Sequence, residues 1–226
     1  MNKLARWFRR FRLGKKFKHQ YTCHPDFDII RNDENFTIIW KKQAVANVGQ
    51  VSSLRNKFSA NCFTIATGPS LNEIDLVKSD AYDSISLNCA ISRFLENNLK
   101  PTHCLIVDHR VFENHWDSVK DSILSGAYCY FSYVGLSRIC EREPELLNHK
   151  NIYLIESIGR QFGIARPSLS EFHRIYDNDA EIFLDPEFPD SRGTIGFSNN
   201  AEKGFFSGKT VATWAAQLAN YLGYQN

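Results

Sequence analysis

Apolar and polar positions alternate in short blocks from residue 61 to the end of the chain. Apolar runs rich in Ile, Val, Phe and Tyr predict strands, and the longer amphipathic stretches between them predict helices. The predicted strands are 63–67, 84–88, 103–108, 127–131 and 151–155, and the predicted helices are 90–98, 112–125, 136–147 and 207–222. This alternation is typical of an α/β fold with a mostly parallel sheet and helices on both faces.

The regions around this core have weaker patterns. Residues 20–60 are predicted to be an irregular lead-in, with a possible edge strand at Phe36–Trp40 and an irregular connection over Gln43–Lys57. Residues 177–206 are rich in Asp, Asn, Pro and Gly, and a polar insertion of this length is often a lid over an active site. With 226 residues, one domain over 61–226 accounts for the core.

The first 19 residues form a segment of their own. Leu4, Trp7, Phe8 and Phe11 follow the i, i+3, i+4, i+7 spacing of one helix face, and basic residues cover the other face. We therefore predict a basic amphipathic helix over 1–19 that lies on the inner face of the inner membrane. A solvated tail, or a helix packed on the body with its cations outward, is the alternative.

Composition narrows the class of protein. Residues 1–18 hold eight of the 27 Lys and Arg and no acid, so the rest of the chain has 19 basic and 25 acidic residues. A body with this negative balance is a poor match for broad nucleic-acid binding, and we expect no nucleic acid as a partner. The six cysteines lack any C-x-x-C pair, which indicates reduced thiols in a cytoplasmic protein.

Candidate site residues follow the predicted strands. In an open α/β sheet, ligands bind beyond the carboxyl ends of the strands, where Thr67-Gly68-Pro69-Ser70, Asn88 and Asp108 stand, with Ser132 as a further candidate. The Gly-Pro-Ser turn lets an anion approach the backbone at a helix start. Asn88 offers an amide to a base or a sugar hydroxyl. Asp108 is expected to have a raised pKa in a solvent-poor cleft, which would suit acid or base work.

A second anion-suited stretch is Ser207-Gly208-Lys209-Thr210, before the last predicted helix. It is not a P-loop, because Lys203 stands where the first glycine of G-x-x-x-x-G-K-[ST] is required. Its hydroxyls, its glycine and the free N–H groups of a helix start still predict an anion site. We expect this stretch and the turn at residues 67–70 to form one nucleotide site.

The order of these motifs resembles two families of bacterial enzymes. Thr67-Gly68-Pro69-Ser70-Leu71, Ser86-Leu87-Asn88 and Ser207-Gly208 before a helix of small residues are similar to the sialyltransferases of glycosyltransferase family 42. Residues 101–112 and 196–221 are similar to the lipopolysaccharide-core Kdo transferases. Both families use CMP-activated acidic sugars on cell-surface glycolipids. The resemblance implies a single Rossmann-like domain that binds a CMP-sugar.

The resemblance also assigns roles to residues. It implies that Gly68-Pro69-Ser70 and Asn88 contact the CMP part and that Ser207-Gly208 contact the phosphate, with Thr67, Lys209 and Thr210 beside them. The sialyltransferases have an asparagine at the position of Asp108, and a carboxylate there repels an acidic donor unless it is protonated or paired with Lys209, Arg110 or Arg192. The family continues past the position of Asn226, so we expect a truncated member.

The expected reaction is transfer of Kdo or sialic acid from a CMP-sugar to a lipopolysaccharide or lipooligosaccharide core. Catalytic candidates are Asp108 and, as a replacement base, His173. No cofactor is required, and no metal site is assigned, although Asp177-Asn178-Asp179 leaves a divalent metal open. Two alternatives remain, a diphosphokinase-like enzyme of the Gly-Pro-Ser-Leu type and a non-catalytic remnant of the transferase fold.

Overall fold

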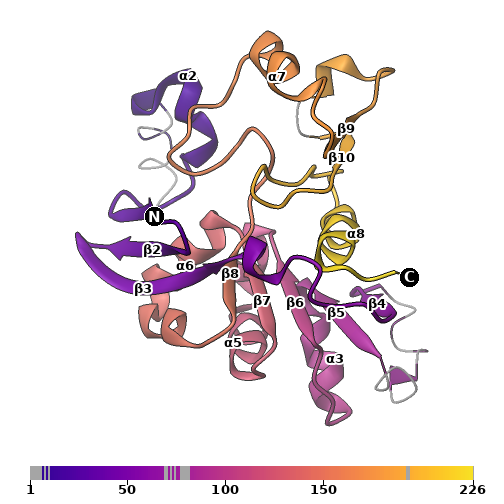
Figure 1. The fold of residues 1–226 in the computed structure, drawn as a ribbon. Helices are drawn as coiled ribbons and strands as arrows, with labels where there is room; N and C mark the ends of the chain where they lie inside the picture. The colour runs from indigo at the N-terminus through magenta and orange to yellow at the C-terminus, as the bar shows by residue number, and fades with distance from the viewer. Residues whose placement is uncertain are drawn as a thin grey trace.

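The fold is built on one eight-stranded sheet (Figure 1). The computed structural model describes residues 7, 9, 11–68, 71, 73, 75, 76, 82–191 and 194–225. The strands are β1 (Phe27–Arg31), β2 (Asn35–Trp40), β3 (Gln43–Gln50), β4 (Cys62–Ile65), β5 (Asp83–Leu87), β6 (His103–Ile106), β7 (Tyr128–Phe131) and β8 (Ile152–Leu154). They lie in the order β1-β2-β3-β8-β7-β6-β5-β4.

Most of this sheet is parallel, which confirms the α/β prediction. Strands β3, β8, β7, β6, β5 and β4 pair in parallel, while β1, β2 and β3 form an antiparallel meander. The prediction for residues 20–60 was wrong in two respects. Gln43–Gln50 is a strand rather than an irregular connection, and β2 lies between two strands rather than at an edge. Strands β1 and β3 were not predicted, because their alternation of apolar and polar residues is poor and pairing with neighbouring strands decides their structure.

Helices cover both faces of the sheet, as predicted. The bounds of the described α-helices are α2 (Gly14–Phe17), α3 (Ile91–Glu96), α4 (His109–Asn114), α5 (Trp116–Leu124), α6 (Tyr133–Arg142), α7 (Leu169–Tyr176) and α8 (Val211–Leu222). Of these, α2 and α7 lie at the upper end of the molecule and not on a face of the sheet (Figure 1). Successive residues of β6 and β7 serve opposite faces: Ile106 and Phe131 pack with α4, α5 and α6, whereas Leu105 and Tyr130 pack with α8. The buried cluster that includes α4, α5 and α6 and the buried cluster that includes α8 therefore lie on opposite faces of the sheet.

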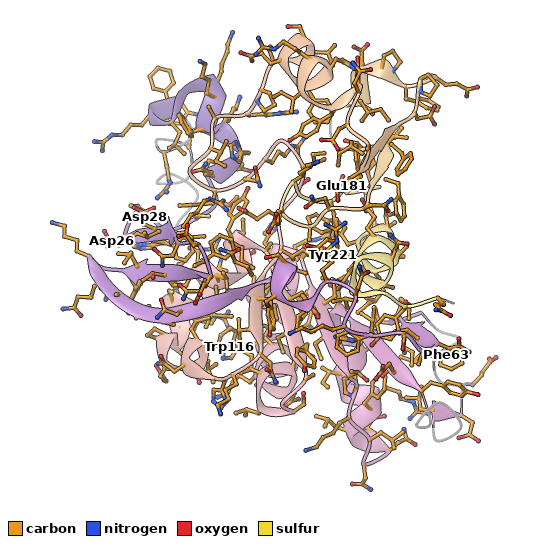
Figure 2. The ribbon with its side chains drawn as sticks, viewed as in Figure 1. Asp26, Asp28, Phe63, Trp116, Glu181 and Tyr221 are labelled. Atoms are coloured by element: carbon orange, nitrogen blue, oxygen red, sulfur yellow. The ribbon has the colours of Figure 1, made fainter. Side chains whose placement is uncertain are left out.

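The segment after β8 lies above the carboxyl ends of the parallel strands (Figure 1). It contains α7 and a small hairpin, in which β9 (Ile182–Leu184) pairs with β10 (Gly196–Ser198). Hydrogen bonds fasten the hairpin base to the body, since the Glu181 carboxylate accepts from Arg55 at 2.8 Å, from Asn200 at 2.6 Å and from Lys203 at 3.0 Å. Figure 2 shows Glu181 above Tyr221 of α8, and the Arg55 guanidinium lies over the Tyr221 ring. The role of this segment as a lid stays a prediction.

The N-terminal segment runs along the same upper side. Its described part is helical at residues 7, 9, 11 and 12, and the chain then passes through Gly14, with φ of +64°, into α2. Trp7 is 61% exposed and Phe11 is 83% exposed, and Leu4 and Phe8 lie outside the described residues. Among the helices of the described chain, none has the length and apolar character needed to cross a membrane.

A buried histidine joins the C-terminal end of α8 to the sheet. One ring nitrogen of His103 lies 3.1 Å from the Tyr130 hydroxyl and the other lies 2.7 Å from the Tyr224 hydroxyl. Phe58 packs edge-on against the same ring at 4.9 Å between centroids. A neutral imidazole donates from one nitrogen and accepts at the other, so the two tyrosines satisfy it without a charge. Burial accordingly lowers the pKa of His103 to about 4.

This histidine makes stability depend on pH. Its folded pKa of about 4 lies below the ordinary value of 6.5, so as pH falls the unfolded chain takes up the proton first. The contribution is fully present above about pH 6.5 and is lost as pH falls towards 4, by up to about 3 kcal/mol of unfolding free energy. We expect His103→Gln to flatten the pH dependence of urea unfolding over this range. His149→Gln, at an exposed histidine, is the control, and equal slopes in all three proteins would contradict the prediction.

Candidate active site

A cavity of about 310 Å³ lies at the carboxyl ends of the parallel strands β5 to β8. Its walls come from the four strand ends, the start of α6, the loop after β8 and the start of α8. The lining residues are Asn88, Val107, Asp108, His109, Ser132, Tyr133, Val134, Ile155, Glu156, Ser157, Arg160, Ser207, Lys209, Thr210, Val211 and Trp214. The cavity thus occupies the edge at which open α/β sheets bind ligands.

Many of the residues proposed from the sequence meet here. The cavity is lined by Asn88, Asp108, Ser132, Ser207, Lys209 and Thr210, although Ser207 and Asn88 are 119 positions apart in sequence. Gly208 lies between two lining residues. Thr67 and Gly68 follow β4 at the same edge of the sheet, are exposed and do not line the cavity. Pro69 and Ser70 lie outside the described residues, so their predicted contacts with a nucleotide stay predictions.

Asn88 stands at the end of β5 with a polar atom that lacks a partner among the described residues. Its φ is +53°, in the left-handed region, which asparagine adopts more readily than most residues other than glycine. Its Oδ1 atom is buried and has no hydrogen-bond partner among the described residues. Buried polar atoms without a partner are uncommon in folded proteins, and in the lining of a cavity a ligand can supply the missing bond. Asn88 therefore points to a ligand that donates a hydrogen bond.

The turn at 207–210 is shaped by its glycine. Gly208 has φ of +49°, and a Cβ atom there would lie 2.1 Å from the Thr213 hydroxyl, so no side chain fits without displacing that residue. Lys209 also has a positive φ, of +57°. Thr210 then caps α8 by accepting a hydrogen bond from the Ala212 N–H at 3.3 Å. The turn thus directs the N-terminus of a 12-residue helix at the cavity.

A second helix begins at the same place. Ser132, which follows β7, caps α6 by accepting a hydrogen bond from the Gly135 N–H at 3.2 Å. The positive ends of the α6 and α8 dipoles consequently both face the cavity, with N–H groups that favour an anion. Attraction of an anion by a helix N-terminus was predicted for residues 207–210, and the structure shows a second such helix start, that of α6.

The expectation of a raised pKa for Asp108 was wrong. The Arg110 guanidinium donates to both carboxylate oxygens, with its Nε atom 3.0 Å from Oδ1 and 2.9 Å from Oδ2, and the Arg110 N–H donates to Oδ1 at 2.9 Å. These bonds hold the pKa of Asp108 below its ordinary value despite partial burial. Of the three partners considered for this carboxylate, Arg110 is the one that pairs with it, whereas Arg192 lies outside the described residues. Asp108 is ionised and also caps α4.

Glu156 is a lining residue that the sequence did not single out. Its side chain is 6% exposed, and its carboxylate accepts from Arg31 at 2.8 and 3.0 Å and from the Phe162 N–H at 2.7 Å. Burial raises its pKa, and Arg31 and Phe162 oppose that shift. The triple contact fixes the loop after β8, which brings Ser157 and Arg160 into the cavity. No motif signals this residue, because its partner on β1 is 125 positions away.

Within the described part of the chain, the two cations of the cavity lining lack the ion-pair partners that its two acids have. Neither the Arg160 guanidinium nor the Lys209 ammonium has a hydrogen bond or ion pair with any residue in the described ranges. Both lining carboxylates, in contrast, are neutralised by arginines. The side chains and the two helix starts therefore leave a cavity suited to an anionic ligand. Arg160 could not be found from sequence, because it follows no strand end directly.

His173 and the Asp177-Asn178-Asp179 stretch lie elsewhere. His173 is on α7, outside the cavity lining, and its ring nitrogens lie 2.7 Å from Asp177 Oδ1 and 2.7 Å from the Pro189 carbonyl. These two acceptors raise its pKa and hold it as a protonated donor, which does not fit a base. Asp179 pairs with Lys203 at 2.7 Å. Within the described ranges, no group of three or more His, Cys, Asp and Glu side chains is arranged to hold a metal.

The clamp at Glu156 gives a stability prediction. Glu156→Gln leaves the Arg31 guanidinium without its charge partner, and we expect a loss of about 2 kcal/mol of unfolding free energy. Arg31→Met alone leaves a buried carboxylate unpaired and costs a similar amount. The double variant should lose less than the sum of the two, because neither charge is then left alone. Urea unfolding measures all three, and strict additivity would contradict a direct clamp.

The family model for 3-deoxy-D-manno-octulosonic acid transferase WaaZ matches residues 45–226. No curated protein and no solved structure gave a match. The match includes every lining residue of the cavity, and it confirms the resemblance to the transferases of 3-deoxy-D-manno-octulosonic acid, or Kdo. The resemblance to the sialyltransferases stays a prediction. The chain therefore belongs to the WaaZ family of Kdo transferases.

Proposed function

We propose that the chain transfers Kdo from CMP-Kdo to a sugar of the lipopolysaccharide core and binds the donor in the cavity at the ends of β5 to β8. The observation that carries this proposal is that two helix N-termini and two cations without a partner in the described part of the chain surround that cavity. CMP-Kdo is an anion at both its phosphate and its sugar, so its charge matches the cavity. The family match supports Kdo as the sugar, rather than the sialic acid that the sequence left open.

The two anionic groups of the donor correspond to two parts of the cavity. The phosphate fits beside the turn at residues 207–210, at the positive end of the α8 dipole and near the Lys209 ammonium. The Gly208 and Thr210 N–H groups are not part of this contact, because they donate to the Thr194 and Ser207 carbonyls. The carboxylate of Kdo then faces Arg160, whose planar guanidinium suits bidentate recognition of a carboxylate. The unpaired Asn88 amide oxygen is available to the amino group of the cytosine or to a ribose hydroxyl. This assignment gives a role to the Arg160 guanidinium, the Lys209 ammonium and the Asn88 Oδ1 atom, none of which has a hydrogen-bond partner among the described residues.

The chemistry follows from these positions. A hydroxyl of the acceptor attacks the anomeric carbon of Kdo, the bond from that carbon to the phosphate oxygen breaks, and CMP leaves with the electron pair. Lys209 and the α8 N-terminus stabilise the charge that grows on the departing phosphate. The proton of the attacking hydroxyl needs an acceptor, and ionised Asp108 is our candidate. Glu156 is less suited to this step, because its side chain is buried, whereas that of Asp108 is partly exposed.

The location of the acceptor adds a membrane to this proposal. A lipopolysaccharide core is attached to lipid, so the transferase has to work at a membrane surface. The exposed Trp7 and Phe11, next to exposed Arg12 and Lys15, match the composition of an interfacial segment. We therefore place the chain on the inner face of the inner membrane.

Calorimetric titration with CMP tests the donor site. We expect wild-type protein to bind CMP and Lys209→Met to weaken that binding about 10-fold. One charge-assisted contact to phosphate contributes roughly 1.5–3 kcal/mol, and solvent screening of the exposed lysine reduces this contribution. Lys100→Met, which removes an exposed lysine at the opposite edge of the sheet, is the matched control. No binding at millimolar CMP would overturn the donor proposal. Binding of ATP instead of CMP would favour the diphosphokinase-like alternative.

A second variant tests the proton acceptor. Asp108→Asn keeps the α4 cap, because asparagine is an equally good cap, and removes the basic oxygen. We expect kcat with CMP-Kdo and a core acceptor to fall by about 10² to 10⁴, as for loss of a general base, while CMP affinity is unchanged or improved. Unchanged kcat would show that Asp108 is not the base. CMP binding by wild-type protein without any turnover would favour the non-catalytic remnant.

A further inference from the structure

A second cavity, of about 190 Å³, lies between the N-terminal segment and α7. It is separate from the site described above and shares no lining residue with it. Its walls are Lys16, Ala165, Arg166, Pro167, Glu171, Arg174 and Ile175. Three of these seven residues are cationic and one is acidic, so the cavity has an excess of positive charge.

The acid offsets these cations only in part. The Glu171 carboxylate accepts from the Ser168 N–H at 2.7 Å as part of the α7 capping box, and this bond lowers its pKa, with a smaller contribution from the charges of Lys16 and Arg174. The Lys16 ammonium and the Arg174 guanidinium are both exposed, and neither forms a hydrogen bond or ion pair with another residue of the described chain. Two positive side chains are therefore available to an anion that enters the cavity.

The two segments around this cavity form one continuous surface. The Arg166 N–H donates to the Lys16 carbonyl at 2.8 Å. Three residues further along, a ring nitrogen of His19 lies 3.1 Å from the Gln161 carbonyl, and the Tyr133 hydroxyl donates to the His19 carbonyl at 3.1 Å. These bonds fix the N-terminal segment against the loop before α7. Figure 1 shows both at the upper end of the molecule, on the side of the strand carboxyl ends.

Exposed apolar side chains lie on the same segments that form the cavity. Ile175 lines it and is 51% exposed, and Ile164, next to lining residue Ala165, is 45% exposed. Trp7 and Phe11 stack at 6.5 Å between ring centroids on the helical stretch that leads to Lys16. Exposed basic residues at positions 12, 15 and 18 lie among them. Aromatic and aliphatic side chains mixed with lysine and arginine are typical of a surface that enters a bilayer interface.

We propose that Trp7, residues 11–20, the loop 161–168 and α7 together form one membrane-docking face, and that its basic cavity receives the phosphate of an anionic phospholipid. The charge of the face selects this occupant, because lipid phosphates complement the cations while acyl chains accept the apolar side chains. A second copy of the chain would bring like charges together. This inference rests on the proposed function in one respect, namely that the acceptor is attached to a membrane lipid.

One loop connects docking to the active site. The segment between β8 and α7 contributes Glu156, Ser157 and Arg160 to the site cavity, and Ala165 and Arg166 to the basic cavity. Docking by the upper side therefore places the site cavity next to the lipid surface on which a core acceptor is anchored. A helix 1–19 acting alone, as the sequence suggested, would tether the chain without orienting it. The second contact on α7 fixes the orientation.

Co-sedimentation of the full chain with vesicles tests this face. We expect binding to vesicles of phosphatidylethanolamine with phosphatidylglycerol, and little binding to phosphatidylcholine alone. Lys16→Gln with Arg174→Gln should lower the partition coefficient by roughly 30-fold, because each cation at the surface contributes about 1 kcal/mol. Both residues are exposed, so folding is unaffected. Ile175→Ser should weaken binding further without any change in charge.

The matched control is Lys100→Gln with Lys150→Gln, which removes the same charge at the amino ends of the strands. Equal losses in the two double variants would overturn the proposal, because binding would then follow net charge alone. Equal binding to phosphatidylcholine, or no binding to either vesicle, would also overturn it. Calorimetry with CMP runs in parallel. Absence of CMP binding in a chain that docks as expected would reject the proposed donor and leave the docking face standing.

Discussion

The parallel pairing of β5, β6, β7 and β8 is the constraint on which the rest of the structure depends. Register pairs such as Leu87 with Leu105 and Phe131 with Leu154 align the strands so that all four end at one edge. Neighbouring strands lie only about 4.8 Å apart, so the residues that follow them are brought together whatever their distance in sequence. Asn88, Asp108 and Glu156 are placed around one cavity for this reason, and α6 and α8 begin beside it.

The electrostatic character of that cavity depends on which of its charged groups have an ion-pair partner, and not on the number of acids and cations. Lining acids and cations are equal in number if only Asp108, Glu156, Arg160 and Lys209 are considered. Arg110 and Arg31 neutralise the two acids from outside the lining, and the two lining cations keep no partner within the described chain. The result is an anion site inside a body whose balance beyond residue 18 is negative. The basic cavity at α7 repeats this arrangement on the outer surface, where Glu171 is engaged in its helix cap.

The alternation of elements and the strand-end candidates were predictable because both depend on local sequence. Apolar runs mark β4 to β8, and the polar residue after a strand marks Asn88, Asp108 and Ser132. The pKa of Asp108 was not predictable in the same way, since an arginine two positions away can point in many directions and only the folded backbone brings Arg110 onto the carboxylate. Glu156 and Arg160 were missed because no strand-end rule or motif covers a loop fixed by β1.

By itself, the sequence determined the α/β class, most of the parallel strands and the family resemblance, because hydrophobic periodicity and short motifs are properties of neighbouring residues. The tertiary structure alone decided that β1 to β3 extend the sheet, which strand ends share a cavity and which charges there are neutralised. Strand pairing, burial and ion pairing depend on residues that are distant in the chain. The Lys16 carbonyl bound to the Arg166 N–H, 150 positions away, is the clearest case: it joins two segments into one surface that neither could form alone.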